Sequence, residues 1–165
     1  MNRPTPDPVG PGQESVWDYP RPPIVAPARG HVVIQHRGVT VADTRAALRT
    51  LETSHPPTYY LPPDSVAPGL LRTAPGSSFC EWKGWARYFD LVLPDETVAG
   101  VAWSYPDPTR GFAALRDHLA FYAAPLDAVT IDGEQVTPQP GGFYGGWITR
   151  NLAGPFKGVP GSRFW

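Results

Sequence analysis

The sequence predicts a single domain of mainly β structure with two short helices, an α+β fold. Apolar residues make up 41% of the 165 residues and aromatic residues 12%, which is enough to bury a core. Proline (22) and glycine (17) recur throughout and separate short β-prone runs, a pattern typical of many turns and short strands. Only two stretches have the composition of helices: residues 45–52, after a cap at Asp43 or Thr44, and residues 110–117, after Thr109.

The two ends of the chain differ in composition from its middle. Residues 1–29 carry eight prolines, which lack a backbone donor and favour extended neighbours, so we expect an extended proline-rich tail. Trp17 and Tyr19 are expected to hold the later half of this tail on the domain. Residues 139–165 are rich in glycine and aromatic residues, and we expect an extension that packs on the domain as irregular structure, with a short strand near residues 144–149.

The region between these segments, residues 30–138, is expected to hold the β-rich domain. Arg37-Gly38 and Asp132-Gly133 are signals of tight hairpin turns, and residues 64–78 read mostly as connection. Strands are expected at residues 31–36, 39–41, 58–61, 80–93, 97–105, 119–122, 128–131 and 134–136.

Charge and composition exclude several classes of protein. The net charge is −1, so neither a nucleic acid nor a membrane is expected as a partner. A single cysteine excludes a disulfide framework and a zinc site of paired CxxC knuckles, and no metal site is expected. GxSxG, HExxH, P-loop and dinucleotide-binding motifs are absent, so the cofactor is unknown. The sequence has neither a signal-like start nor a run of about 20 apolar residues, which favours a cytoplasmic location.

Cys80, the only cysteine, is the candidate catalytic residue. A thiolate is the reactive form of the side chain, and the nearby cations Lys83 and Arg87 would favour it. The alternative is a small buried apolar side chain, which is the more frequent role of a free cysteine. A Cys-His pair would use one of His31, His36, His55 and His118, among which the sequence does not select.

Lys83 and Lys157 are the only lysines, and each follows an aromatic residue and precedes a glycine. Lysine binds phosphate or carboxylate as a point charge, and a glycine such as Gly84 lets a ligand approach the backbone. The alternative is a solvated lysine on an edge strand. Alternation along a strand places Cys80 and Lys83 on opposite sides, so Lys83 is expected to point away unless a turn intervenes.

Aromatic residues concentrate around the same region. Tyr60, Tyr88, Trp103 and Tyr105 are expected to line a ligand pocket in which the rings stack and the hydroxyls orient the ligand. Arg45, on the first expected helix, is expected to contribute to this ligand-binding site. The alternative is that the aromatic side chains form core and that the arginine lies on a solvated face.

The motifs, taken in order, resemble those of the DUF427 domain family. The resemblance starts near Val32 and rests on ADTRAALRTLETSHPPTYYLP, SFCEWKGWARYFDLVL, AWSYPDPTRGF and HLAFYAAPLDAVTIDGE. The C-terminal QPGGFYGGWITRNLAGPFKGVPG is similar to an extension found in one branch of that family. The resemblance implies the Mss4-like β-tent architecture of coiled antiparallel sheets. Relatives with this architecture often hold zinc with paired cysteines, which this chain lacks.

The same resemblance implies a site without an established activity. The family's cysteine–lysine motif corresponds to Cys80, Lys83, Gly84 and Tyr88, and its aromatic–proline motif corresponds to Trp103, Tyr105 and Pro106. The family sometimes carries a nucleotidyltransferase label. Such enzymes usually need Gly-Ser followed by two metal-binding carboxylates, and Asp90-Leu91-Val92 lacks the second acid, so the residues argue against that activity.

Two hypotheses about function follow. The first is a domain that binds a small molecule in an aromatic pocket near Cys80 and Lys83, with the question of catalysis left open. The second is a non-catalytic protein-interaction module that uses the two terminal segments. The concentration of polar and aromatic residues between residues 77 and 108 favours the first.

Overall fold

The computed structural model describes residues 3–165, and the fold is mainly β, as the sequence predicts. The strands form five small sheets, and every strand pair is antiparallel except one. Helical structure in this part of the chain is limited to three 3-10 helices: η1 (Val16–Asp18), η2 (Pro63–Ser65) and η3 (Arg110–Leu115). Between residues 3 and 165, no helix is long and apolar enough to cross a membrane.

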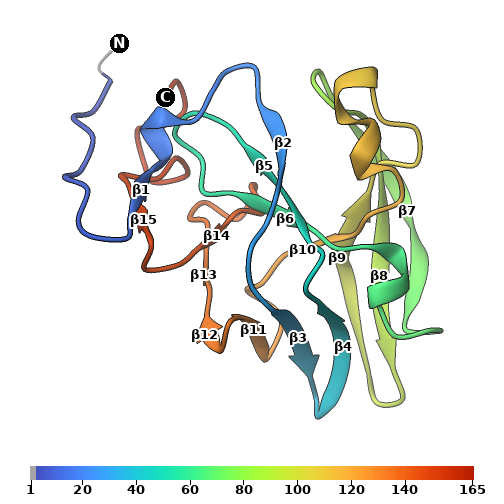
Figure 1. Cartoon of the computed structure of the whole chain (residues 1–165). Helices are drawn as coiled ribbons and strands as arrows, with labels where there is room; N and C mark the ends of the chain where they lie inside the picture. The colour runs from blue at the N-terminus through green and yellow to red at the C-terminus, as the bar shows by residue number, and fades with distance from the viewer. Residues whose placement is uncertain (1–2) are drawn as a thin grey trace.

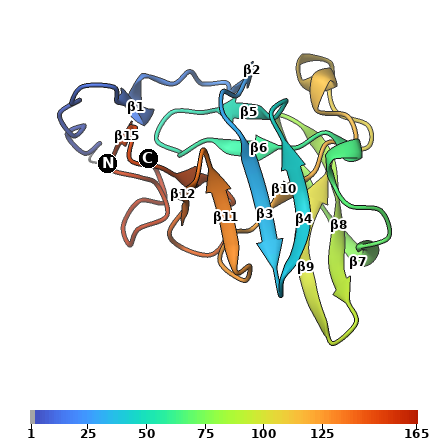
Figure 2. The same ribbon diagram turned by 60° about the horizontal axis from the view of Figure 1, so that its bottom comes forward.

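Two four-stranded sheets form the body of the molecule (Figures 1 and 2). The first has the order β10-β9-β8-β7, with bounds Ala120–Phe121, Glu96–Ser104, Gly84–Leu93 and Leu71–Cys80. The second has the order β12-β11-β3-β4, with bounds Glu134–Gln135, Ala128–Ile131, Val32–His36 and Val39–Thr44. The expected hairpin turn between β3 and β4 is confirmed: Arg37 and Gly38 have φ values of 52° and 75°, the left-handed conformation that a tight hairpin requires.

The third sheet corrects the expectation of a helix over residues 45–52. β5 (Leu48–Leu51) lies there, paired on one side with β2 (Ile24–Pro27) and on the other with β6 (Thr58–Tyr60). The expected cap contact does form, because Thr44 Oγ1 accepts a hydrogen bond from the backbone N–H of Ala46 at 2.9 Å, but it closes a turn. Backbone pairing on both sides outweighs the weak helix preference of alanine, leucine and arginine. The second expected helix is present only as the 3-10 helix η3.

The edge strand β7 runs through residues that were expected to be connection. Pro75 and Gly76 lie within it, at an irregularity of register between Thr73 and Ser77. An edge strand and a bulge are the places where a sheet tolerates proline, which explains why the turn formers do not end the strand. The single strand expected over residues 80–93 is also interrupted, because residues 81–83 form a turn before β8 begins.

The two terminal segments lie side by side, as the blue and red ends of the ribbon in Figure 1 show. β1 (Glu14–Ser15) pairs in parallel with β15 (Leu152–Ala153). The indole of Trp17 is 6% exposed and donates its Nε1–H to the carbonyl oxygen of Pro155 at 2.9 Å. In the C-terminal extension, β14 (Trp147–Ile148) forms where a short strand was predicted and pairs with β13 (Thr137–Pro138).

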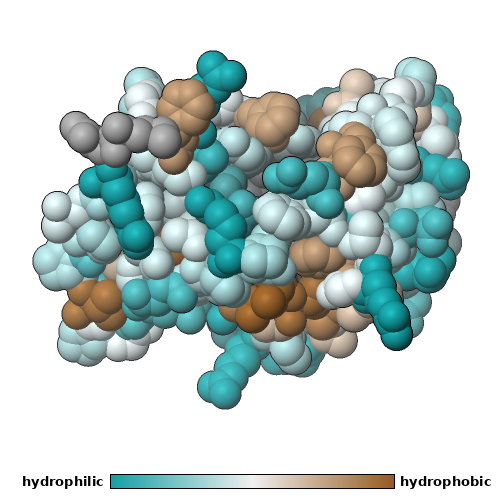
Figure 3. Space-filling view, turned by 90° about the horizontal axis from the view of Figure 1, so that it is seen from above, coloured by the Kyte–Doolittle hydropathy of each residue, from teal (hydrophilic) through white to brown (hydrophobic). Residues whose placement is uncertain are grey.

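The main core combines side chains of the two large sheets, among them Ile34, Val41, Leu91, Val101 and Val129. A second buried group surrounds the aromatic side chains near Cys80, and a third joins the two terminal segments. On the face that Figure 3 shows, hydrophilic side chains dominate and hydrophobic ones form separate small groups.

Candidate functional site

A cavity of about 360 Å³ lies where the β7–β8 turn, the β5–β6 region and the C-terminal extension meet, and we call it the aromatic cavity. Its aromatic lining consists of Tyr60, Phe79, Trp82, Tyr88, Trp103, Tyr105, Tyr122, Phe143 and Tyr144. Its polar lining consists of Thr50, Glu52, His55, Thr58, Ser78, Cys80, Lys83, Gln139 and Lys157.

Most of the site residues predicted from the sequence meet in this cavity. Those that line it are Tyr60, Cys80, Lys83, Tyr88, Trp103 and Tyr105. Gly84 and Arg45 are not part of the lining. Arg45 is exposed in the connection between β4 and β5, because its segment is a turn followed by a strand instead of a helix.

Gly84 has a structural position behind the turn that carries Lys83. Its φ is 104°, and a Cβ at this position would meet the backbone oxygen of Asp107 at 3.3 Å. The same neighbouring segment fixes the turn, because the backbone N–H of Thr109 donates to the carbonyl oxygen of Lys83 at 3.0 Å. The Thr109 hydroxyl also donates to the carbonyl oxygen of Trp82. Gly84 thus allows the turn and residues 107–109 to come close together.

Lys83 points toward Cys80, contrary to the strand alternation expected from the sequence. Because the chain turns at residues 81–83, Nζ of Lys83 lies 3.7 Å from Sγ of Cys80. The ammonium group also lies 5.8 Å from the ring centroid of Tyr105 and 5.9 Å from that of Phe112. The cation is therefore held between a thiol and two aromatic faces.

The tyrosines deepest in the cavity are neutral hydrogen-bonding groups. Burial raises the pKa of Tyr60 and that of Tyr105 well above the ordinary value, so both hydroxyls stay protonated. Their ring centroids are 6.2 Å apart. Nearer the opening, the hydroxyl of Tyr88 lies 2.6 Å from that of Ser78 on the neighbouring strand. The wall thus offers apolar area together with uncharged hydroxyls.

The C-terminal extension forms the opposite wall. A Cβ at Gly145 would lie 2.2 Å from the outer edge of the Trp103 indole, so only glycine lets the chain run this close to the ring. Tyr122 also packs against Trp103, with ring centroids 4.6 Å apart, and donates a hydrogen bond to the carbonyl oxygen of Phe143 at 3.2 Å. Trp103 is thereby enclosed between the sheet and the extension.

Lys157 brings a second cation to the cavity from this extension. Its Nζ lies 5.7 Å from the ring centroid of Tyr144 and donates to the backbone oxygen of Trp165 at 3.3 Å. Burial lowers the pKa of Lys157, and the charge of Arg21 lowers it further. Both lysines of the chain therefore line one cavity, although 74 positions separate them in the sequence (157 − 83).

His55 is the candidate histidine that shares this cavity with Cys80. Burial and the charges of Lys157, Arg21 and Lys83 lower its pKa to about 3, so the imidazole is neutral at physiological pH. The carboxylate of Glu52 lies 3.8 Å from Nε2 of His55 and 3.6 Å from Nε of Arg21. His31, His36 and His118 make their polar contacts outside this lining.

Several lining residues were not singled out from the sequence as site residues. Gln139 and Tyr144 come from loops far from Cys80 along the chain, and only the fold brings them into the cavity. Gln139 links two of the elements, because its Nε2 lies 3.2 Å from His55 Nδ1 and donates to the carbonyl oxygen of Lys157 at 2.9 Å. Only Lys157 had a sequence signal, the aromatic-Lys-Gly pattern that it shares with Lys83.

Within residues 3–165, no group of three or more histidine, cysteine, aspartate or glutamate side chains is arranged to hold a metal ion. No curated protein matches the chain. Residues 24–132, more than half of the chain, match the model of a family described as "Domain of unknown function (DUF427)". The β-tent architecture and the branch with the C-terminal extension stay predictions. This protein belongs to the DUF427 family.

Proposed function

We propose that this protein binds a small molecule with a planar apolar body and an anionic group in the aromatic cavity. The observation that carries this proposal is that Lys83 and Lys157, the only lysines of the chain, line the same aromatic cavity. Neither forms an ion pair with an acidic side chain of residues 3–165. Glu52 is the only acidic side chain of the lining, and it pairs with Arg21, so two cations that form no ion pair of their own favour an anionic ligand.

The size and the lining of the cavity support the rest of this description. Its volume of about 360 Å³ is within the usual range of small-molecule sites, roughly 300–1,000 Å³. Aromatic faces such as those of Trp82, Trp103 and Tyr88 suit a flat ligand that stacks on them. Burial and the charge of Arg21 lower the pKa of Lys157, and a bound anion would favour the charged form of this side chain.

The thiol of Cys80 lies beside the anion contact and gives the site a means of covalent chemistry. The ammonium of Lys83, 3.7 Å away, would favour the thiolate form of the side chain, which is the form that attacks an electrophilic ligand. Neutral His55 lines the same cavity, where its Nδ1 accepts a hydrogen bond from Gln139 Nε2. We propose that binding of this ligand is the function of the cavity. We further propose that Cys80 reacts as a nucleophile with a bound electrophilic ligand.

The alternative, a protein-interaction module built on the two terminal segments, has less support. β1 and β15 pair with each other, and the side chains of Trp17 and Tyr19 are buried. The two segments therefore use these surfaces for contacts within the protein, and the surfaces are not exposed to a partner. Deleting residues 1–28 would also remove β2, which pairs with β5, and so would disturb the fold together with any partner site. A point substitution in the cavity is therefore the sharper test.

The test compares two fluorescent probes of similar shape. Anilinonaphthalene sulfonate is flat, aromatic and anionic, whereas phenylnaphthylamine lacks the sulfonate. The proposal predicts that the wild-type protein binds the anionic probe and that Lys83→Gln weakens this binding about tenfold, the usual effect of losing one charged contact. Binding of the neutral probe should change little.

Two controls make the result specific. Arg110→Gln removes a positive charge on η3, outside the lining, and should leave binding of both probes unchanged. Trp103→Leu removes an aromatic face on which a ligand can stack, and it should weaken the binding of both probes. If Lys83→Gln and Arg110→Gln have the same effect, or if the wild type binds neither probe, the proposed function is wrong.

A further inference from the structure

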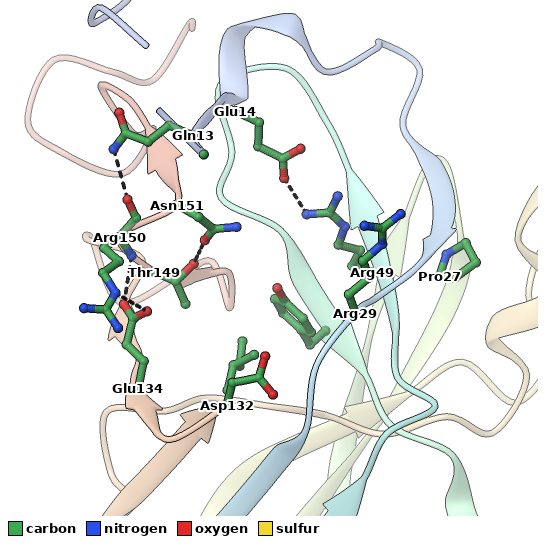
Figure 4. A pocket seen from close by; sticks show the side chains of 13 residues that line it. Gln13, Glu14, Pro27, Arg29, Arg49, Asp132, Glu134, Thr149, Arg150 and Asn151 are labelled. Carbon is green, nitrogen blue, oxygen red and sulfur yellow. Dashed lines mark hydrogen bonds and ion pairs between the residues drawn. The ribbon is translucent and has the colours of Figure 1, made fainter. Parts of the chain in front are cut away.

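A second cavity, of about 760 Å³, lies between the two terminal segments and the second four-stranded sheet (Figure 4). It shares no lining residue with the aromatic cavity. Gln13 and Glu14 line it from the N-terminal segment, and residues 149–151 line it from the C-terminal extension. Three arginines also line it, Arg29, Arg49 and Arg150, together with the acids Glu14, Asp132 and Glu134. We call it the arginine cavity.

The three acids of this cavity are already engaged. Glu14 accepts hydrogen bonds from Arg49 Nη1 at 2.6 Å and from the Tyr19 hydroxyl at 2.9 Å. Burial alone would raise the pKa of Glu14, but these two hydrogen bonds outweigh burial and lower it, so the group is a carboxylate. Glu134 accepts from the backbone N–H of Arg150 at 2.8 Å and lies 3.3 Å from its Nε.

Asp132 holds the loop that carries Arg29. Its Oδ1 accepts from the backbone N–H of His31 at 2.8 Å, and its own N–H donates to the carbonyl oxygen of His31 at 2.9 Å. A Cβ at Gly30, which has a φ of 100°, would lie 2.8 Å from Asp132 Oδ2, so the glycine allows this close packing. These contacts hold the backbone of residues 30–31, next to Arg29, against the turn between β11 and β12.

The unused hydrogen-bonding capacity of the cavity consists mainly of donors. Arg29 forms neither an ion pair nor a hydrogen bond with the side chains and backbone of residues 3–165, and Arg49 uses only Nη1 in its bond to Glu14. The side-chain oxygen of Asn151 accepts a hydrogen bond from the Thr149 hydroxyl, which leaves its Nδ2 group as a donor. Figure 4 draws the guanidinium groups of Arg29 and Arg49 on the same side of the cavity.

We propose that the arginine cavity binds a small oxyanion, a carboxylate or phosphate group of a polar metabolite, between Arg29 and Arg49. A guanidinium group offers paired N–H donors that match two oxygens of such a group, and two guanidinium groups on adjoining segments favour an anion between them. The segments adjoin because Arg49 lies opposite Ala26 in the β2–β5 pair, shortly before Arg29 in the chain. The volume leaves room for a hydroxylated body of several carbon atoms.

The test is calorimetric titration of the full chain with inorganic phosphate and, separately, with citrate, at constant ionic strength. The expected result is saturable binding of at least one of the two anions, which also identifies the preferred oxyanion. Arg29→Gln should weaken this binding about tenfold. Because Arg29 is exposed and makes no contact within residues 3–165 that the fold needs, this variant is expected to fold normally.

Matched variants separate this site from the aromatic cavity. Arg110→Gln removes an exposed arginine elsewhere and should leave the affinity unchanged. The double variant Lys83→Gln/Lys157→Gln removes the two lysines of the aromatic cavity and should also leave the affinity for the anion unchanged. The outcome of this test therefore does not depend on the proposed function. As a second readout, the arginine Nε–H signals of Arg29 and Arg49 should shift in NMR spectra on titration. Absence of saturable binding, or equal losses in Arg29→Gln and Arg110→Gln, would overturn the proposal.

Discussion

The ammonium group of Lys83 lies 3.7 Å from the sulfur of Cys80, across a turn that reverses the chain between β7 and β8. In a continuous strand these two side chains would point to opposite faces. The turn therefore converts two residues of a sequence motif into one chemical unit at the edge of an aromatic cavity.

Lys83→Gln should slow the alkylation of Cys80 by iodoacetamide at neutral pH about fivefold. A unit charge at about 4 Å stabilises a thiolate by about 1 kcal/mol even at the dielectric constant of water. Mass spectrometry at timed intervals gives the rate, and the single thiol makes assignment unnecessary. Arg87→Gln removes an exposed cation of β8 outside the cavity lining and should react at the wild-type rate. Equal rates in the wild type and in Lys83→Gln would show that the contact has no influence on the thiol.

Gly145→Ala should reduce the free energy of unfolding by about 1–3 kcal/mol, because the added methyl group would overlap the Trp103 ring. Denaturant titration measures this change. Gly111→Ala is the control, since a Cβ there meets no atom within 4 Å and the φ of Gly111 is not positive. If both variants are as stable as the wild type, the extension does not pack against Trp103 as described.

Acidification should destabilise the protein through His55. Its pKa is about 3 in the folded protein and about 6.5 when unfolded, so the unfolded chain binds the additional proton between these values. Stability attributable to His55 is complete above about pH 6.5 and falls as the pH decreases, by about 2 kcal/mol at about pH 5.

His55→Gln isolates this effect, because glutamine does not titrate. The difference in stability between wild type and variant, measured by denaturant titration from about pH 7 to about pH 5, should shrink by the same 2 kcal/mol. The opposite slope, or a constant difference, would mean that the imidazole is not buried as a neutral group in the native protein.

Trp17→Ala should reduce the free energy of unfolding by about 3–5 kcal/mol, the usual range for loss of a buried tryptophan. Trp17→Phe keeps most of the apolar area but removes the hydrogen bond to Pro155, and should reduce it by about 1 kcal/mol. Val9→Ala alters a side chain that is 52% exposed in the same segment and should be neutral. A neutral Trp17→Ala would instead indicate that the tail does not contribute to the stability of the fold.

Local sequence was sufficient for the parts of this fold that depend on few neighbouring residues. The turns at Arg37-Gly38 and Asp132-Gly133 have the left-handed φ values that their sequences favour. β5 could not be predicted in this way, because pairing with two distant strands decides its conformation against its own helix preference. β7 was not predicted, because the dipeptide Pro75-Gly76 is typical of a turn. An edge strand accommodates this dipeptide at a bulge.

In the candidate site, too, some residues are placed by local sequence and others by the fold of the whole chain. Cys80, Lys83 and Tyr88 come from one hairpin, so their proximity follows from a short stretch of sequence. His55 and Lys157 reach the cavity through loops whose paths depend on packing of the whole chain, and no local pattern places them there. The role of Gly84 also became visible only with the neighbouring segment, which fills the space that a ligand was expected to occupy.

The parallel pair of β1 and β15 has a consequence for synthesis on the ribosome. Glu14 leaves the ribosome long before Leu152, and at about 5–20 residues per second the N-terminal strand waits several seconds or more for its partner. Both cavities also need the late segment, because Lys157 completes one and residues 149–151 complete the other. The nascent protein can therefore form its two cavities only when translation of this segment is finished.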